Sequence, residues 1–258
     1  MKRLLPLLMM VLLPCLPAFS AVKSKVITYQ KAGETFEGLY VYPDHVKGKV
    51  PGVLVVHNWL GLTEETKFQA ERIAALGYAV FAVDVYGKGV RPKGPEEAGQ
   101  LAGKYKGDRA LLRDRLMLGL ETLKAQSQVD SQKLSALGYC FGGTAALELG
   151  RAGADLKAII SFHGGLDSPA PADGKNIKGR VLALHGADDP YVKPEDVAAF
   201  ENEMRTNNVD WQLVKFGGAV HSFTEKAAGN DNSKGAAYNA KADARSFQAF
   251  KDLMQEVF

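Results

Sequence analysis

Short apolar runs alternate with amphipathic segments along most of the chain, and this alternation restricts the fold more than any other feature of the sequence. The run from Val50 to His57 is almost entirely apolar, as expected of a strand that is covered on both faces. Residues 64–76 then carry apolar side chains at helical spacing, and Gly77 supplies a helix stop. Repeated strand–helix units of this kind predict a mostly parallel, doubly wound α/β sheet with helices on both faces.

The same alternation continues to the end of the chain. It predicts five further strands and four further helices: strands at 78–83, 134–139, 158–162, 181–184 and 211–216, and helices at 110–126, 144–151, 194–205 and 236–258. Residues 25–29 and 35–42 alternate polar and apolar side chains, which predicts an antiparallel hairpin at the N-terminal edge of the sheet. Residues 86–99 are rich in Gly, Pro and Lys and are predicted to form a loop. No linker or repeat divides residues 21–258, so we expect a single domain there.

Composition excludes several classes of protein. Of the 258 residues, 46% are hydrophobic and 24% are charged, which is ordinary for a globular chain and not for a disordered one. The formal net charge is only +3 and no run of Lys or Arg is long, so we expect no nucleic-acid partner. Two cysteines are too few for a disulfide scaffold or for a zinc site of the CxxC…CxxC type. We expect neither a metal nor an organic cofactor.

The first twenty residues have the layout of a secretory signal peptide. Residues 2–3 are basic, residues 4–19 form an apolar run, and Ala18 and Ser20 supply the small side chains of a cleavage site ahead of Ala21. A retained membrane anchor is the alternative, but three prolines interrupt a run that is shorter than the roughly 20 residues of a spanning helix. We therefore predict export to the periplasm or the medium, with no stable membrane anchor after cleavage.

The sequence Gly-Tyr-Cys-Phe-Gly-Gly at 138–143, between a predicted strand and a predicted helix, is the strongest local motif. It matches the nucleophile elbow G-x-S-x-G with cysteine in place of serine. The glycines let neighbouring chain pass close to a sharp turn, and the helix N-terminus favours the thiolate of Cys140. Signal cleavage removes Cys15, so Cys140 would be the one thiol of the exported chain. The competing interpretation is a buried, inert cysteine at a tight turn packed with glycines.

A thiol nucleophile needs a base and an acid that orients the base, and in elbow proteins the acid precedes the histidine in the chain. Of five histidines, only His221 lies in a loop after the last predicted strand and before the last helix, and we interpret the others as turn or supporting residues. Asp188 and Asp189 both follow the strand at 181–184, where an Asp can also simply form a turn. The pattern favours Asp189 without excluding Asp188.

Together these features resemble the dienelactone hydrolase family of the α/β-hydrolase fold, over essentially the whole of residues 21–258. The matching stretches are 55–62, 83–87, 138–143, 185–191 and 221–223. The resemblance implies that Cys140, Asp189 and His221 form a triad that opens an ester or lactone through a thiol ester. It also implies an oxyanion hole made by the backbone N–H groups of Phe141 and Trp59.

The sequence departs from the family at two positions. Asn58 stands where the family has a glutamate, and Glu225 stands where the dienelactone enzymes have a carboxylate-binding arginine. With Asn58 in place, we expect nothing acidic to compete with His221 for the thiol proton. Cys140 should then rest at least partly as a thiolate paired with imidazolium.

The expected function is hydrolysis of a small-molecule carboxylic ester or lactone by covalent thiol catalysis, in a monomer. Asn58, Tyr86 and Phe223 lie in the matching stretches and are expected to contact the substrate, and the basic loop 86–99 is expected to border the pocket. Two other classes remain: a catalytically silent α/β-hydrolase that acts as a binding module, and a thiol-based sensor. The sensor is the weaker of these, because a redox pair needs a second cysteine.

Overall fold

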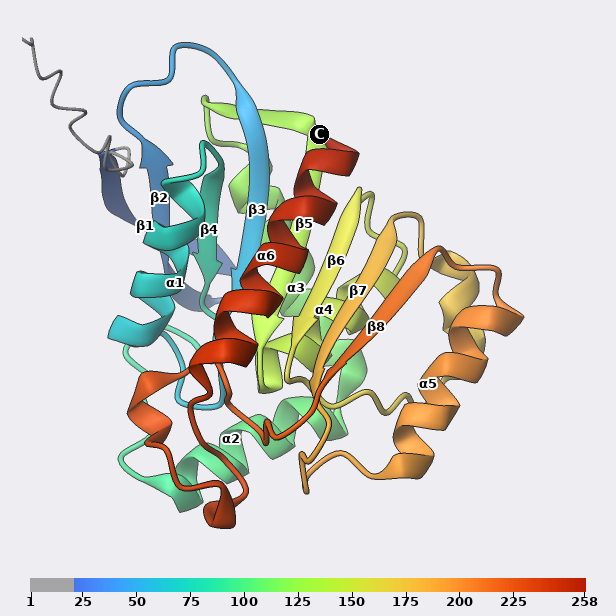
Figure 1. Cartoon of the computed structure of the whole chain (residues 1–258). Coiled ribbons are helices and arrows are strands. Elements are labelled where there is room, and N and C mark those ends of the chain that lie inside the picture. The colour runs from blue at the N-terminus through green and yellow to red at the C-terminus, as the bar shows by residue number, and fades with distance from the viewer. Residues whose placement is uncertain (1–20) are drawn as a thin grey trace, which may run out of the picture.

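Eight strands of the described residues join into one sheet in the computed structural model (Figure 1). The structure describes residues 21–258, and the predicted signal segment 1–20 lies outside the described residues. The strands are β1 (Val22–Lys31), β2 (Glu34–Pro43), β3 (Val50–Val56), β4 (Ala79–Val83), β5 (Val129–Tyr139), β6 (Ala158–Phe162), β7 (Arg180–Gly186) and β8 (Trp211–Phe216). They lie in the order β1-β2-β4-β3-β5-β6-β7-β8.

Strand direction divides the sheet into an edge and a body. β1 is antiparallel to β2, and β2 is antiparallel to β4, so the first hairpin forms an antiparallel edge. All neighbouring pairs from β4 to β8 are parallel. The expectation of a mostly parallel sheet with an antiparallel N-terminal edge is therefore confirmed.

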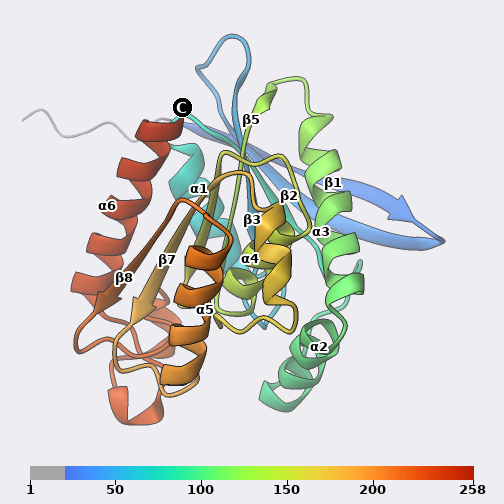
Figure 2. The same cartoon turned by 90° about the vertical axis from the view of Figure 1, so that its right-hand side faces the viewer.

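Helices cover both faces of the sheet. They are α1 (Glu64–Ala74), α2 (Pro95–Gly107), α3 (Arg109–Lys124), α4 (Phe141–Arg151), α5 (Pro194–Thr206) and α6 (Ala240–Val257), with 3₁₀ turns η1 (Pro171–Asn176), η2 (Lys226–Ala228) and η3 (Asn232–Lys234). Figure 2 shows α1 and α6 on one side of the sheet and α3 on the other. The two apolar layers follow the alternation of the strands: in β3, Leu54 and Val56 join the layer of α3 and α4, whereas Val53 and Val55 join that of α1 and α6.

Several predicted boundaries are wrong. The strand predicted at 134–139 begins at Val129, and the helix predicted at 144–151 begins at Phe141. The segment 86–99 is not a loop throughout, because α2 begins at Pro95. Gly94 caps this helix, Pro95 occupies its first turn, and two glutamates in that turn complement the helix dipole. The last helix begins at Ala240 and not at 236, because Asn239 accepts hydrogen bonds from the backbone N–H groups of residues 241 and 242 and so caps it.

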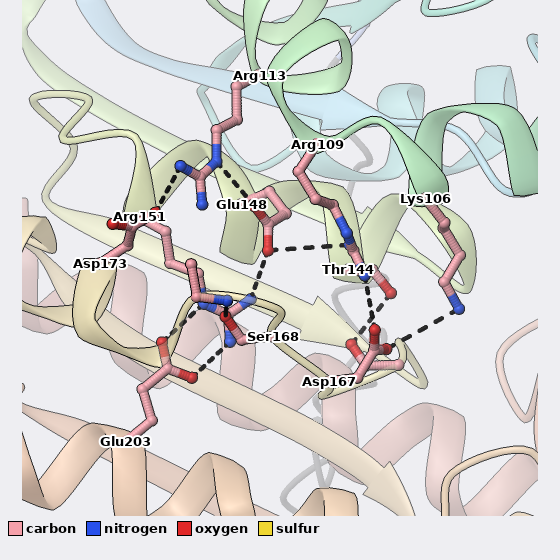
Figure 3. Close-up of polar contacts among 12 residues, drawn as sticks. Lys106, Arg109, Arg113, Thr144, Glu148, Arg151, Asp167, Ser168, Asp173 and Glu203 are labelled. Carbon is pink, nitrogen blue, oxygen red and sulfur yellow. Dashed lines mark hydrogen bonds and ion pairs between the residues drawn. The ribbon is translucent and has the colours of Figure 1, made fainter.

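A cluster of buried ion pairs holds the C-terminal half of α4 against its neighbours (Figure 3). Arg151 donates to both oxygens of Glu203 on α5, at 2.8 and 2.7 Å, and to Glu148 one turn earlier, at 3.0 Å. Glu148 also accepts from Arg113 on α3 at 2.8 Å. Because Arg151 and Glu148 are fully buried, these bonds replace the water that both charges lose on folding. We call this set the ion-pair cluster; its members are Arg109, Arg113, Glu148, Arg151, Asp167, Asp173 and Glu203.

Parallel strands end at one edge of the sheet, and the segments that follow β3, β5, β7 and β8 meet there. Ligand sites of open α/β sheets lie outside these carboxyl ends. The segments carry the predicted site residues, which makes this edge the place to look for chemistry. Across residues 21–258, no helix combines the length and the apolar character that a membrane span requires.

Candidate active site

Cys140 occupies the sharp turn between β5 and α4, with φ +56° and ψ −118°. Residues other than glycine rarely adopt positive φ, so the turn is strained. The flanking glycines are required by close packing. A Cβ on Gly138 would lie 2.1 Å from the Gly142 oxygen, and a Cβ on Gly142 would lie 2.2 Å from the Val56 oxygen. The motif at 138–143 is therefore a geometrical elbow that presents a half-buried thiol at the start of a helix.

His221 and Asp189 come from the loops after β8 and β7 and contact each other. His221 Nδ1 lies 2.8 Å from Asp189 Oδ2, and the carboxylate is fully buried. The other oxygen of Asp189 accepts the Tyr191 N–H at 2.8 Å. Asp188 instead accepts the N–H of Gly218 at 2.9 Å and serves a turn. The ambiguity between the two neighbouring aspartates is thus resolved in favour of Asp189 as the partner of His221.

The charges around His221 favour its protonated form. Burial alone would lower the pKa of His221, but the negative charge of Cys140, the hydrogen bonds to Asp189 and Cys140, and the charge of Asp189 outweigh it and raise the pKa to about 10. With Nδ1 directed to Asp189, Nε2 remains for the sulfur. The arrangement therefore favours the imidazolium form of His221 beside the sulfur of Cys140.

Phe141 and Trp59, the two residues expected to donate their backbone N–H groups to an oxyanion, both line the cavity beside Cys140. Phe141 is the first residue of α4, so its N–H has no acceptor one turn earlier in the helix. Trp59 lies in the turn after β3 and lines the same cavity as Cys140. The Trp59 carbonyl accepts a hydrogen bond from the Tyr86 hydroxyl at 3.0 Å, which ties this turn to the end of β4.

His163 supports the elbow from the adjacent strand end. The Cys140 N–H points to the Phe162 oxygen at 3.0 Å and to His163 Nδ1 at 3.2 Å. His163 Nε2 lies 2.8 Å from the Thr224 hydroxyl. Burial, with the charge of His221, holds the pKa of His163 well below its usual value. A neutral ring that accepts at Nδ1 and donates at Nε2 fits both contacts, in agreement with its interpretation as a supporting residue.

Glu225 lies against Asn58. Its Oε2 accepts from Asn58 Nδ2 at 3.2 Å, and the side chain is buried. Burial raises the pKa of Glu225 to about 7, despite the opposing hydrogen bond from Asn58. The expectation that nothing acidic competes with His221 for the thiol proton was based on position 58 alone, and the loop after His221 brings the Glu225 carboxyl next to that position. Nothing in the local sequence signals this contact between residues 167 positions apart.

A cavity of about 340 Å³ opens beside the thiol. Its lining includes Trp59, Lys106, Cys140, Phe141, Tyr191 and His221. Asn58, Tyr86 and Phe223 are buried and do not contribute to that lining, so the geometry gives them a supporting place and does not favour direct substrate contact.

The segment 86–99 was expected to border the pocket, but none of its residues line the cavity. The later part of α2 supplies Ala102 and Lys106 instead. The basic residues of the preceding loop are engaged elsewhere: Lys88 pairs with Glu37, and Arg91 donates to the Leu62 carbonyl at 3.1 Å. Within the part of the chain that the structure describes, no group of three or more His, Cys, Asp or Glu side chains has the spacing of a metal site.

Comparison with known proteins places this geometry in a family. A model of the dienelactone hydrolase family matches residues 36–258. The solved structure called m3DLH is 42% identical, with a TM-score of 0.89 over 93% of this chain and 100% of that one. A dienelactone hydrolase-like promiscuous phosphotriesterase, P91 from metagenomic libraries, is 38% identical, with a TM-score of 0.87 over 93% of this chain and 100% of that one.

A relative from Synechocystis sp., provisionally named carboxymethylenebutenolidase, is 26% identical over 91% of this chain and 97% of its own length. The family model spans most of the chain and includes the elbow, the Asp189 turn and the His221 loop. The chain therefore belongs to the dienelactone hydrolase family of ester and lactone hydrolases.

Proposed function

We propose that this chain hydrolyses carboxylic esters or lactones through a covalent thiol ester on Cys140, with His221 as the proton carrier and Asp189 as its orienting acid. The observation that carries the proposal is the contact of His221 with both Asp189 and Cys140, on the wall of a cavity at the carboxyl edge of the sheet. A nucleophile, a base and an acid that orients the base form a recurring set for acyl transfer.

Acylation begins with the thiolate of Cys140, which attacks the carbonyl carbon of the substrate. The carbonyl electrons move to oxygen, and the N–H groups of Phe141 and Trp59 donate to the resulting oxyanion. When the tetrahedral centre collapses, the C–O bond to the alcohol breaks, and His221 Nε2 gives its proton to the departing alkoxide. For a lactone the alcohol stays attached to the acyl group. A single product, the hydroxy acid, is therefore released, and only when the thiol ester is hydrolysed.

Deacylation reverses these roles with water. Neutral His221 takes a proton from a water molecule, and the hydroxide attacks the thiol ester carbon. The C–S bond then breaks, the acid is released, and the thiolate–imidazolium pair is restored. Asp189 holds His221 in the tautomer that both steps need. It accepts a hydrogen bond from the Nδ1–H group and leaves Nε2 facing the sulfur.

The cavity supports a small substrate. A volume of about 340 Å³ lies at the lower end of the usual range for small-molecule sites. Trp59, Phe141 and Tyr191 contribute aromatic side chains to its walls, and Lys106, which pairs with Asp167, also lines it. These features suit an ester or lactone with a compact apolar acyl group.

The test uses p-nitrophenyl acetate and the variant Cys140→Ala. Alanine removes only the sulfur, so the fold should remain while kcat falls by about 10⁴–10⁶-fold. Iodoacetamide should abolish the activity of a chain that begins at Ala21, which lacks Cys15, with one carboxamidomethyl group per chain. A variant with a tenth of the original activity would contradict the covalent mechanism. Inertness of the unmodified protein towards a panel of esters and lactones, with its thiol intact, would instead support the binding-module alternative.

Phosphotriester hydrolysis is a second candidate activity. It is supported by the 38% identity to P91, whose name describes that protein as a promiscuous phosphotriesterase. The Cys140 thiolate would attack phosphorus and expel an aryloxide, and water would then hydrolyse the S–P bond. Release of many equivalents of p-nitrophenol from paraoxon, lost in Cys140→Ala, would support this activity. A single equivalent would show that the thiol is trapped and not regenerated.

Export also remains a proposal, supported by the layout of residues 1–20. Expression of the full chain in a bacterium, followed by fractionation and N-terminal sequencing, tests it. Recovery in the periplasm or medium with Ala21 as the first residue is the expected result. A chain retained in the cytoplasm or membrane with residues 1–20 attached would contradict it.

A further inference from the structure

Glu225 has one bonded and one unbonded carboxyl oxygen at the back of the active site. Oε2 accepts from Asn58 Nδ2 at 3.2 Å, whereas Oε1 is buried and has no hydrogen-bond partner among the described residues. The residue is only 8% exposed. A buried carboxyl with a free oxygen costs stability, so it needs a reason beyond packing. The contact of Oε2 with Asn58 supplies such a reason, because Asn58 shapes a turn of the active site.

Asn58 shapes the turn that carries Trp59. Its Oδ1 accepts the N–H of Leu60 at 2.9 Å, and its backbone oxygen accepts the N–H of Gly61 at 3.2 Å. These two bonds close the turn on either side of Trp59. The side-chain amide thus has its oxygen committed to the turn and its nitrogen committed to Glu225.

Glu225 determines which way the Asn58 amide points. An ionised carboxylate only accepts hydrogen bonds, and the Leu60 N–H only donates. If the amide were rotated by 180°, its oxygen would face Glu225 and its NH₂ group would face the Leu60 N–H, which replaces two bonds by two repulsions. Without the negative charge at Glu225, this preference weakens. The ionised carboxylate of Glu225 therefore fixes the orientation of the Asn58 amide, and with it the turn.

The charge of Glu225 responds to several neighbours. Burial raises its pKa most, Asn58 lowers it by donating a hydrogen bond, Glu65 on α1 raises it by its negative charge, and protonated His221 lowers it; the result is about 7. Tyr139 on β5 also faces this carboxyl, but burial keeps the phenol neutral at these pH values. The carboxyl of Glu225 is thus expected to lose its proton, and to begin to hold the Asn58 amide, within the neutral pH range.

We propose that Glu225 is a positioning residue, whose carboxylate holds Asn58 in the one amide orientation that keeps the Trp59 N–H placed for the oxyanion. The proposal rests on the thiol-ester function described above. Glu225 acts through Asn58 and does not touch the reacting atoms, so its loss affects the transition state more than substrate binding. Its signature is a fall in kcat with little change in KM, and a pH dependence of kcat that belongs to this carboxyl.

The variants Glu225→Gln and Glu225→Ala test the proposal with p-nitrophenyl acetate between pH 5.5 and 9. Wild type should show a step in kcat near pH 7, higher on the alkaline side. Glu225→Gln keeps an oxygen acceptor but no charge, so it should lack the step and stay near the acidic plateau. Glu225→Ala should lose about tenfold to a hundredfold in kcat, which is typical of a misplaced catalytic group. KM should change less than about threefold in both.

Glu65→Gln is the matched control, because Glu65 lies near Glu225 but donates nothing to the turn; it accepts from Gln69 at 2.9 Å. It should keep the alkaline plateau of kcat and move the step to lower pH, since it removes a negative neighbour of Glu225. The double variant Asn58→Ala with Glu225→Ala gives a second test. If both residues act through one turn, the second substitution should cost less than about threefold after the first.

Three results would overturn the proposal: a wild-type pH step that survives in Glu225→Gln, full additivity in the double variant, or a parallel loss in the rate of Cys140 alkylation. The last would show that Glu225 acts on the thiol and not on the turn. These outcomes are separate from failure of the thiol-ester function itself. If Cys140→Ala is inactive and Glu225→Gln is unchanged, only the role of Glu225 fails; if Cys140→Ala is active, the thiol mechanism fails first.

Discussion

The two ends of α4 carry buried charged groups that are organised in different ways. At its C-terminal half, the ion-pair cluster pairs Arg151 with both oxygens of Glu203 and with Glu148. At its N-terminus, Cys140 contacts His221, and nearby Glu225 keeps an unbonded oxygen. The first region is built from arginine–carboxylate pairs, with Arg109 Nε and Nη1 left without a hydrogen bond among the described residues, and the second retains groups that can change charge.

The difference shows how one helix can serve as both anchor and reactive element. Guanidinium groups stay protonated at any working pH, so the ion-pair cluster cannot exchange protons and holds α4 in place. At the other end, burial and neighbouring charges move pKa values towards or past neutrality, to about 7 at Glu225 and about 10 at His221. Strongly shifted groups in a cleft are typical of functional sites.

The largest effect that separates the two ends is expected from Asp189→Asn. An amide at 189 can donate to His221 Nδ1 and so favour the tautomer with its proton on the wrong nitrogen. We expect kcat to fall by about 10³–10⁴-fold with little loss of stability. Asp188→Asn is the control and should stay within a few-fold of wild type, because Asp188 accepts only from the Gly218 turn. Equal effects at 188 and 189 would show that the contact with His221 is not what matters.

Glu203→Gln should have the opposite profile. It breaks the bidentate pair and leaves buried Arg151 partly unpaired, which costs about 3–5 kcal/mol of unfolding free energy. Urea unfolding measures this loss, and the folded fraction should keep the wild-type pH profile of kcat. Glu201→Gln, on the same helix, removes the partly exposed pair with Arg205 and should cost less than about 1 kcal/mol. A similar cost at both positions would contradict the anchoring role of the cluster.

Glu225 should give a smaller, pH-dependent change in stability. Its pKa rises from 4.5 to about 7 on folding, so the folded state binds this proton more tightly than the unfolded state. The stability that it contributes is therefore lost as the pH rises from about 4.5 to 7. Relative to Glu225→Gln, wild type should lose about 1–3 kcal/mol of unfolding free energy between pH 4.5 and pH 8. A constant difference over this range would show that Glu225 is ionised throughout.

The smallest effect is expected from Asn58→Asp. A carboxyl at 58 faces Glu225, and two adjacent carboxyls tend to share one proton. The added negative charge behind the site should slow iodoacetamide alkylation of Cys140 a few-fold above pH 7. Rates that match wild type at every pH would mean that Asn58 lies outside the electrostatic environment of the thiol, and would confine its role to the Trp59 turn.

The sequence could predict most of the fold and the main grouping of the site because both follow from local pattern. Parallel strands deliver their carboxyl ends to one edge, so the residues after them, including Cys140, Asp189 and His221, had to meet. Gly138 and Gly142 marked the elbow because no other residue fits so close to a neighbouring backbone.

The features that the sequence did not predict depend on how loops and helices are placed in three dimensions and not on local sequence pattern. The start of α2 at Pro95 was hidden among glycines that also suit a loop, although Pro95 and the acidic residues after it are helix-start signals. The Asn58–Glu225 contact depends on how the loop after His221 turns back, and no periodicity encodes that turn. The cavity position of Lys106 follows from α2 and was missed with it.

The positive φ of Cys140 sets stability against activity at a single position. The conformation costs about 1–3 kcal/mol for any side chain with a Cβ, and glycine would relieve most of it. Even after the extra freedom that glycine gives the unfolded chain, Cys140→Gly should be at least as stable as wild type. A search for thermostable variants would therefore favour the substitution that removes the nucleophile, so directed evolution of this chain must select on turnover and not on melting temperature alone.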